Sequence, residues 1–217
     1  MEDHPPLYAL DVSRSYGDFL ALAPVELTLF AGQLVVLTGP NGAGKTTLLH
    51  CLSGLLRPST GRVSIAGYDL YAQERQARRH LAFVPDVPRF YTELTAWEHL
   101  QFIALAHDAG QGFAQRADAL LREFNLWDAR DLYPHNYSRG MRLKLGLLMA
   151  LIRPFKVLLL DEPTSALDAD STALLLARLD SLRAQGVSIL FSTHNPEIAH
   201  SRADRCLELH NGQLEAV

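Results

Sequence analysis

One short stretch constrains the fold of this chain more than any other. Residues 39–47 read Gly-Pro-Asn-Gly-Ala-Gly-Lys-Thr-Thr, which fits the pattern G-x-x-x-x-G-K-[ST] without a mismatch. Residues 34–37, Leu-Val-Val-Leu, are typical of a buried strand, and residues 46–56 carry apolar side chains at helical spacing. A strand, a glycine-rich turn and a helix in this order predict a loop that binds phosphate.

The residue types in this loop predict how it would bind a polyphosphate. Gly39, Gly42 and Gly44 let backbone N–H groups gather around an anion, at a helix N-terminus whose dipole favours negative charge. We expect Lys45 to reach the β- and γ-phosphates and the Thr46 hydroxyl to coordinate Mg²⁺. A glycine turn with a surface lysine is the alternative, and the flanking strand and helix argue against it. The expected nucleotide-binding loop comprises Gly39, Pro40, Asn41, Gly42, Ala43, Gly44, Lys45, Thr46 and Thr47.

A second group of chemically capable residues follows residues 157–160, a fully apolar run typical of a strand buried on both faces of a parallel sheet. Asp161 and Glu162 come directly after it, at the strand end where open α/β sheets bind ligands. Asp161 suits Mg²⁺, and Glu162 suits polarisation of the water that attacks a γ-phosphate. Taken alone, these acids are equally well explained as a strand end that meets solvent. The phosphate loop upstream favours the functional interpretation.

Length and composition limit the class of protein. A chain of 217 residues suits one large domain, or a domain with a small lobe, and its net charge of −4 argues against nucleic acid or acidic lipid as a partner. Cys51 and Cys206 lie far apart in apolar surroundings, which predicts two buried thiols in a reducing compartment. The acidic, proline-rich N-terminus is unlike a signal peptide, and no apolar run approaches the roughly 18 residues of a membrane span. We therefore expect a soluble, cytoplasmic protein.

The phosphate loop and the hydrophobic periodicity together predict an α/β protein with a P-loop NTPase core, a mainly parallel sheet, an antiparallel β lobe and an inserted helical lobe. We expect one domain over residues 1–217, with the core and β lobe in 1–88 and 137–217 and the helical lobe in 89–136. The expected strands are 7–12, 24–30, 34–37, 61–66, 81–84, 157–160 and 187–191, followed by a β-rich tail over 205–214. The expected helices are 46–56, 75–80, 97–107, 114–124, 139–151 and 171–184, with a capping box at Thr95 and Glu98 and a cap at Ser138.

Together these motifs make the chain resemble the ATP-binding subunit of an ABC transporter over essentially its whole length. The resemblance rests on the phosphate loop, the Asp161-Glu162 pair, the loop at residues 165–168 and His194, which follows the expected strand at residues 187–191. It implies that His194 contacts the γ-phosphate and links it to Glu162, so that Lys45, Glu162 and His194 form the catalytic set. It also implies that Tyr16 stacks on adenine, although simple turn packing is the alternative for this side chain.

Two positions depart from the family pattern. The serine-glycine-glycine signature, which in the family faces the nucleotide of the opposite subunit, is represented by Ser138, Arg139 and Gly140. Arg139 replaces the first glycine, and its charge either adds to the γ-phosphate site or faces solvent. Asp86 occupies the place of a glutamine that senses Mg²⁺, and we expect it to bind Mg²⁺ through water while adding negative charge beside Asp161 and Glu162. Both departures resemble a bacterial branch that serves export-type permeases.

The resemblance implies an ATPase that uses ATP and Mg²⁺ and yields ADP and phosphate. A second ATPase subunit, identical or a paralogue, would close head-to-tail around two Mg·ATP, and a polytopic membrane permease would hold the pair at the inner face of the membrane. The expected docking surface is residues 86–91 with the helical lobe, where Phe90 and Tyr91 are either interface anchors or core residues.

Two other functions fit an ATPase of this type. One is an ABC-type ATPase without a transporter, such as a translation factor or a DNA-repair ATPase. The chain carries neither a second such domain nor a long coiled-coil insertion, and its acidic balance argues against nucleic acid. The other is a nucleotide-binding regulator that hydrolyses ATP weakly. Glu162 and His194 argue against that possibility, whereas Asp86 and Arg139 leave it open.

Overall fold

The computed structural model describes residues 4–216, and their contacts group into two compact units. We call Met1–Phe83, Phe155–Glu162 and Leu179–Val217 the core unit, and Val84–Pro154 and Pro163–Arg178 the helical unit.

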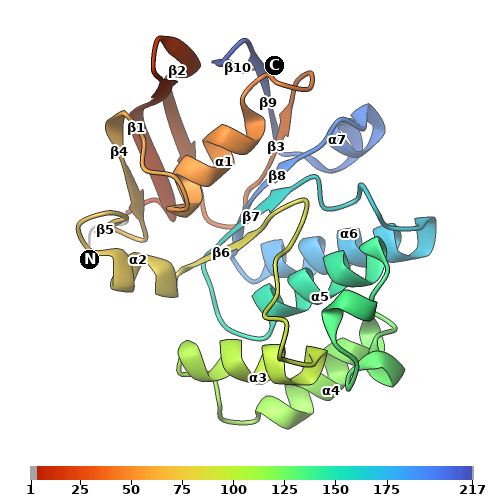
Figure 1. Cartoon of the computed structure of the whole chain (residues 1–217). Coiled ribbons are helices and arrows are strands. Elements are labelled where there is room, and N and C mark those ends of the chain that lie inside the picture. The colour runs from red at the N-terminus through yellow and green to blue at the C-terminus, as the bar shows by residue number, and fades with distance from the viewer. Residues whose placement is uncertain (1–3, 217) are drawn as a thin grey trace. The chain divides into compact units, whose positions relative to one another are not determined.

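Figure 1 labels the elements along the chain. The strands are β1 (Leu7–Tyr16), β2 (Phe19–Leu29), β3 (Leu34–Thr38), β4 (Thr60–Ile65), β5 (Tyr68–Asp69), β6 (Leu81–Val84), β7 (Val157–Asp161), β8 (Ser188–Ser192), β9 (Arg205–His210) and β10 (Gln213–Ala216). The helices are α1 (Lys45–Ser53), α2 (Glu74–Arg79), α3 (Ala96–Ala106), α4 (Phe113–Glu123), α5 (Arg139–Leu151), α6 (Ala169–Ala184) and α7 (Pro196–Arg202), with short 3₁₀ turns at Trp127–Ala129 and Pro134–Asn136.

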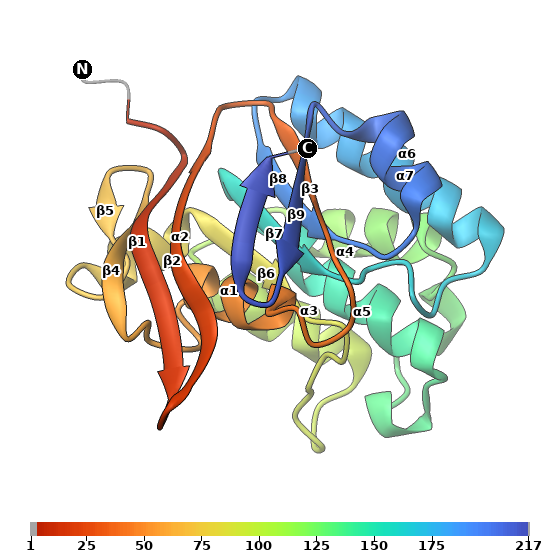
Figure 2. The same ribbon diagram turned by 90° about the horizontal axis from the view of Figure 1, so that it is seen from above.

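Two sheets form the core unit. One has the order β10-β9-β3-β8-β7-β6, in which β3 pairs in parallel with β8 and β9, β7 pairs in parallel with β8, and β10 pairs antiparallel with β9. The other has the order β2-β1-β4-β5 and antiparallel pairing. Figure 2 shows the β1–β2 hairpin and the neighbouring strands β3, β8 and β9 from above. The predicted α/β architecture, with a mainly parallel sheet and an antiparallel β lobe, is confirmed.

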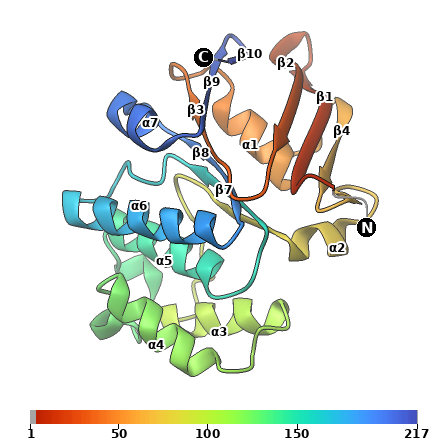
Figure 3. The same cartoon turned by 180° about the vertical axis from the view of Figure 1, so that it is seen from behind.

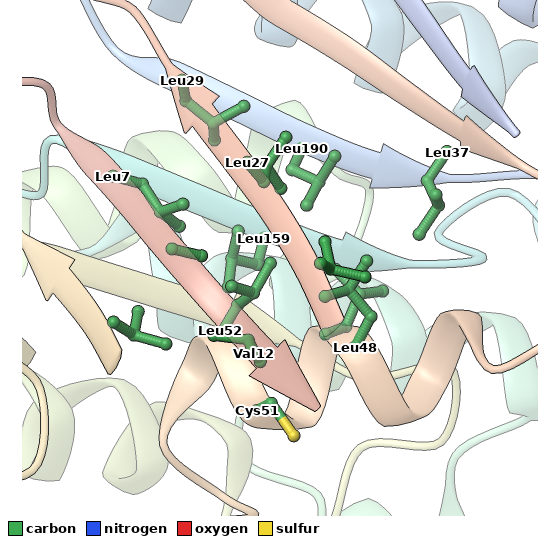
Figure 4. Packing of buried hydrophobic residues seen from close by; sticks show 14 of the residues in the cluster. Leu7, Val12, Leu27, Leu29, Leu37, Leu48, Cys51, Leu52, Leu159 and Leu190 are labelled. Carbon is green, nitrogen blue, oxygen red and sulfur yellow. The ribbon is translucent and has the colours of Figure 1, made fainter. Parts of the chain in front are cut away.

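One apolar cluster joins the two sheets to α1. Leu7 and Leu27 from the antiparallel sheet, Leu48 from α1, and Leu159 and Leu190 from the parallel sheet all belong to it (Figure 4). Strands β7 and β8 are buried along their whole length, whereas β2 alternates between buried and exposed positions over residues 25–29. Strands β3, β8 and β7 are parallel neighbours, so their carboxyl ends lie at the same end of the sheet.

The helical unit contains α3, α4 and α5, which pack on one another (Figure 3). The predicted capping box is present at the start of α3: the Glu98 N–H donates to Thr95 Oγ1 at 3.3 Å, and the Thr95 N–H donates to Glu98 Oε2 at 2.8 Å. Ser138 caps α5 as predicted, since its Oγ accepts from the Met141 N–H at 3.2 Å. These caps supply partners for N–H groups that the helices themselves leave unpaired.

Three details differ from the sequence-based expectations. The hairpin strands β1 and β2 extend much closer to the turn at Gly17 and Asp18, and β1 contains register shifts that bend it. Helix α7 was not predicted. Cys51 is buried, but Cys206 is only half-buried. Within residues 4–216, no helix combines the length and the apolar character needed to cross a bilayer.

Candidate functional site

The phosphate loop connects β3 to α1, as its sequence predicts. Gly44 immediately precedes α1 with φ of 106°, a left-handed conformation that a residue with a side chain rarely adopts. A Cβ at this position would also lie 2.8 Å from the Ala21 carbonyl oxygen of β2. The loop therefore needs glycine here both for its backbone turn and for its close contact with the antiparallel sheet.

Lys45 lies over the loop that precedes it. Its ammonium donates to the carbonyl oxygens of Gly39 at 2.7 Å and Pro40 at 3.2 Å, and the residue is only 7% exposed. The cation is thus held beside the N–H groups at the start of α1, where both the charge and the helix dipole attract an anion.

Asp161 connects the phosphate loop to the end of β7. Its Oδ2 accepts from the Thr46 hydroxyl at 2.8 Å and its Oδ1 accepts from the Ser192 hydroxyl at 2.7 Å, while the residue is 3% exposed. Parallel register explains the second bond, because Asp161 of β7 lies opposite Ser192 of β8. Two of the three predicted Mg²⁺ ligands, Thr46 and Asp161, therefore lie in contact.

Glu162 faces a different group from its neighbour. Its backbone has φ of 46°, which is uncommon for a residue with a side chain, and its N–H donates to Ser192 Oγ at 2.9 Å. Its Oε2 lies 2.9 Å from Nδ1 of His194. The contact between Glu162 and His194 that the resemblance implies is thus present, with the imidazole largely exposed and the carboxylate largely covered.

Ser192 is a functional candidate that sequence analysis missed. It bonds Asp161 with its hydroxyl and accepts from the Glu162 N–H, so one buried side chain orients both neighbouring acids. The available signal was a serine at the carboxyl end of the strand, shortly before His194, which was already expected at the site.

The oxygen ligands present at Thr46 and Asp161 fit a magnesium ion. Mg²⁺ in nucleotide sites uses one or two protein oxygens, with the phosphates and water completing the octahedron. Among residues 4–216 no group of three or more His, Cys, Asp or Glu side chains is arranged to hold a metal.

Tyr16 ends β1 at the hairpin turn and is 48% exposed, so a ring face is open to a ligand. The Arg14 guanidinium lies 4.6 Å from the centroid of the Tyr16 ring, and its Nη1 donates to the Arg57 carbonyl oxygen at 3.0 Å. A cation against an aromatic face is an attractive contact. The ring of Tyr16 is thus supported by an arginine that is itself anchored.

The other predicted site residues, Asp86, Ser138 and Gly140, belong to the helical unit. The Arg139 guanidinium is held by two neighbouring side chains. Its Nη2 donates to Asp86 Oδ1 at 3.1 Å and to Ser165 Oγ at 3.2 Å. Asp86 is consequently engaged by a cation and a hydroxyl.

Comparison with known proteins accounts for this combination of loop, acids and histidine. The family model described as ABC transporter matches residues 22–165. The chain belongs to the ABC transporter family. A solved structure described as the ATP binding subunit of an ABC transporter superposes with a TM-score of 0.91 at 34% identity, over 97% of this chain and 90% of that chain.

Two curated relatives from the ABC transporter family carry more specific names. The SkfA peptide export ATP-binding protein SkfE of Bacillus subtilis is 33% identical over 94% of this chain and 85% of its own length. The sulfate/thiosulfate import ATP-binding protein CysA of Thermosynechococcus vestitus is 37% identical over 95% of this chain and 62% of its own length. The similarity therefore extends to ATP-binding proteins named for export and for import.

Proposed function

We propose that this chain binds and hydrolyses ATP as the motor subunit of a membrane transporter. The observation that carries the proposal is the continuous set of contacts from Thr46 through Asp161 and Ser192 to Glu162 and His194. Such an arrangement places a metal-binding pair and a base–histidine pair beside a phosphate loop, which is what transfer of a γ-phosphoryl group to water requires.

Each residue has a distinct role in this proposal. Lys45 and the N–H groups of the phosphate loop bind the β- and γ-phosphates. Thr46 and Asp161 would hold a Mg²⁺ ion, which would supply positive charge to offset that of the phosphates. Glu162 accepts the proton of the attacking water, while His194 holds the Glu162 carboxylate and contacts the γ-phosphate. Tyr16 stacks on the adenine, with Arg14 supporting the opposite side of the ring.

The Ser138 turn gives a reason for two subunits to act together. Ser138 and Gly140 lie at the start of α5, where the unpaired N–H groups and the helix dipole attract phosphate. We propose that each ATP lies between the phosphate loop of one subunit and the Ser138 turn of another, either an identical copy or a paralogue. ATP binding then closes the pair, and hydrolysis reopens it.

We propose that residues 86–91 and the surrounding helical unit dock on a polytopic permease. Tyr91 is 56% exposed, and a cavity of about 300 Å³ is lined by this segment together with Pro134, His135 and Arg142. Buried His99 fixes the segment: its Nε2 accepts from the Tyr91 N–H at 3.0 Å, so its Nδ1 carries the proton and donates to the Thr95 carbonyl oxygen. A rigidly held, exposed tyrosine suits an interface anchor.

The direction of transport that we favour is export. SkfE is named for export, and the departures at Asp86 and Arg139 resemble the branch that serves export-type permeases. CysA, by contrast, is named for import, so similarity to this chain extends to relatives of both directions.

The substitution Glu162→Gln tests the proposal. It keeps the shape of the side chain and removes the base, so we expect the turnover of Mg·ATP to fall by roughly 10²- to 10⁴-fold. ATP should still bind, and the variant should accumulate as an ATP-bound dimer in size-exclusion chromatography. The matched control is Glu208→Gln, because Glu208 also pairs with a histidine, His210, at 2.8 Å in the core unit.

Two outcomes would contradict the proposal. Unchanged hydrolysis in the Glu162→Gln variant would remove Glu162 as the base. A wild-type chain that binds Mg·ATP but does not turn it over would instead favour the nucleotide-binding regulator. Loss of activity in the Glu208→Gln control would indicate a general effect of removing a carboxylate, and not a catalytic one.

A further inference from the structure

Three side chains from separate segments of the helical unit meet in one cluster. Arg139 at the start of α5 donates from Nη2 to Asp86 Oδ1 at 3.1 Å and to Ser165 Oγ at 3.2 Å. Ser165, which follows β7, donates to the same oxygen of Asp86 at 2.6 Å. We call Arg139, Asp86 and Ser165 the Arg139 cluster. A cation and a hydroxyl thus share a single carboxylate oxygen.

A backbone contact next to the cluster holds two of these segments together. A Cβ on Gly140 would lie 2.7 Å from the Ala166 carbonyl oxygen, so the first turn of α5 and the loop after β7 approach as closely as backbones can. Arg139 and Ser165 are the chain neighbours of these two residues. The hydrogen bond from Arg139 to Ser165 therefore lies beside a close backbone contact between the same two segments. Asp86 connects a third segment to both of them.

Stability of the fold is a poor explanation for the cluster. The side chains of Arg139 and Asp86 are 62% and 36% exposed, and ion pairs of this exposure contribute little to folding because solvent screens them. Charge compensation explains the pair better, since the guanidinium of Arg139 offsets the negative charge of the Asp86 carboxylate.

We infer that Arg139 is a positioning residue that neutralises Asp86 and holds the segment at 86–91 in register with the Ser138 turn. The inference rests on the proposed function, in which the first segment docks on the permease and the second faces a nucleotide. A displacement at the docking segment then reaches the phosphate-facing turn through the Arg139 cluster. Asp86 and Arg139, the two positions that depart from the family pattern, thus act together and not as independent changes.

The test is a double-substitution cycle on the full chain with Mg·ATP as the ligand. We expect Arg139→Gln and Asp86→Asn each to lower kcat by at least about threefold and to leave the KM for ATP within about twofold. The combined variant should lose less than the product of the two single losses, because both substitutions break the same bond. The exchanged pair, Asp86→Arg with Arg139→Asp, should recover activity above either single variant, since the Ser165 hydroxyl can donate or accept.

Asp118 and Arg122 provide a matched control pair on α4. Their salt bridge has a similar length, 3.0 Å, and similar exposures, 40% for Asp118 and 56% for Arg122. Asp118→Asn combined with Arg122→Gln should leave kcat unchanged, and thermal unfolding of all variants should show that each one folds.

The outcomes separate this inference from the function on which it rests. Independent effects of the two substitutions, without recovery in the exchanged pair, would overturn the inference while ATP hydrolysis stands. So would single variants with wild-type kcat. A wild-type chain that does not hydrolyse Mg·ATP would overturn the proposed function, and the inference with it.

Discussion

At the scale of single residues, Glu162 and Ser192 show how a strained backbone is stabilised by its surroundings. Glu162 adopts a positive φ of 46°, a conformation that costs free energy for a residue with a side chain. Its N–H finds a partner in Ser192 Oγ, and the same hydroxyl donates to Asp161. The turn at Glu162 sends its carboxylate toward His194, while Asp161 stays with Thr46. Two adjacent acids therefore serve two different partners.

Ser192→Ala tests this arrangement. Both hydrogen bonds of the hydroxyl are lost in a buried site, so we expect the free energy of unfolding to fall by about 1–3 kcal/mol. We also expect kcat for ATP to fall by about tenfold, equivalent to about 1.4 kcal/mol of transition-state stabilisation, because Asp161 and Glu162 lose their common support. Chemical denaturation and steady-state hydrolysis measure the two effects.

Ser188→Ala is the control for Ser192→Ala. Ser188 lies on the same strand, is equally buried, and donates to the Phe30 carbonyl oxygen at 2.7 Å. Its loss should lower stability by a similar amount without lowering kcat. Equal losses of kcat in the two variants would indicate a general weakening of β8, in disagreement with a role for Ser192 at the site.

At the scale of elements, sequence patterns predicted structure well wherever one local rule dominated. The phosphate loop, the capping box of α3 and the fully apolar strand β7 each follow from residue types at fixed spacing. Helix α7 was missed because its Asn195-Pro196 start is equally typical of a loop. The role of Ser192 was missed because it depends on the register of β7 and β8, which residue spacing does not reveal. The bond from Arg139 to Asp86 likewise joins residues far apart in sequence.

Gly140→Ala tests the contact between α5 and the loop after β7. Alanine normally stabilises a helix by up to about 1 kcal/mol relative to glycine. Here the new Cβ would lie 2.7 Å from the Ala166 carbonyl oxygen, so we expect a loss of about 1–3 kcal/mol instead. Thermal or chemical denaturation gives the sign directly. Gly110→Ala is the control, because its Cβ would meet only the end of the Leu105 side chain at 3.3 Å and should change stability by no more than about 0.5 kcal/mol.

At the scale of the whole molecule, the proposed function divides the work between the two units. The core unit carries the contacts among Thr46, Asp161, Glu162 and His194. The helical unit carries the Ser138 turn and the exposed Tyr91. In the proposed function, a second subunit supplies the Ser138 turn and a membrane partner uses the movement. Identifying that membrane partner is therefore the most informative experiment.

Capture of that partner is the prediction at this scale. The Glu162→Gln chain, held in the closed dimer by Mg·ATP, should recover one polytopic membrane protein from detergent-solubilised membranes of its own source, identified by mass spectrometry. Tyr91→Ala in the same background should reduce recovery by about tenfold or more if Tyr91 is an anchor. Phe30→Ala is the control, because Phe30 is a similarly exposed aromatic residue of the core unit, 58% against 56%. Recovery of ribosomal or DNA-repair proteins without a membrane protein would favour the ATPase that serves no transporter. Equal recovery by the Tyr91 and Phe30 variants would instead place the docking surface elsewhere on the molecule.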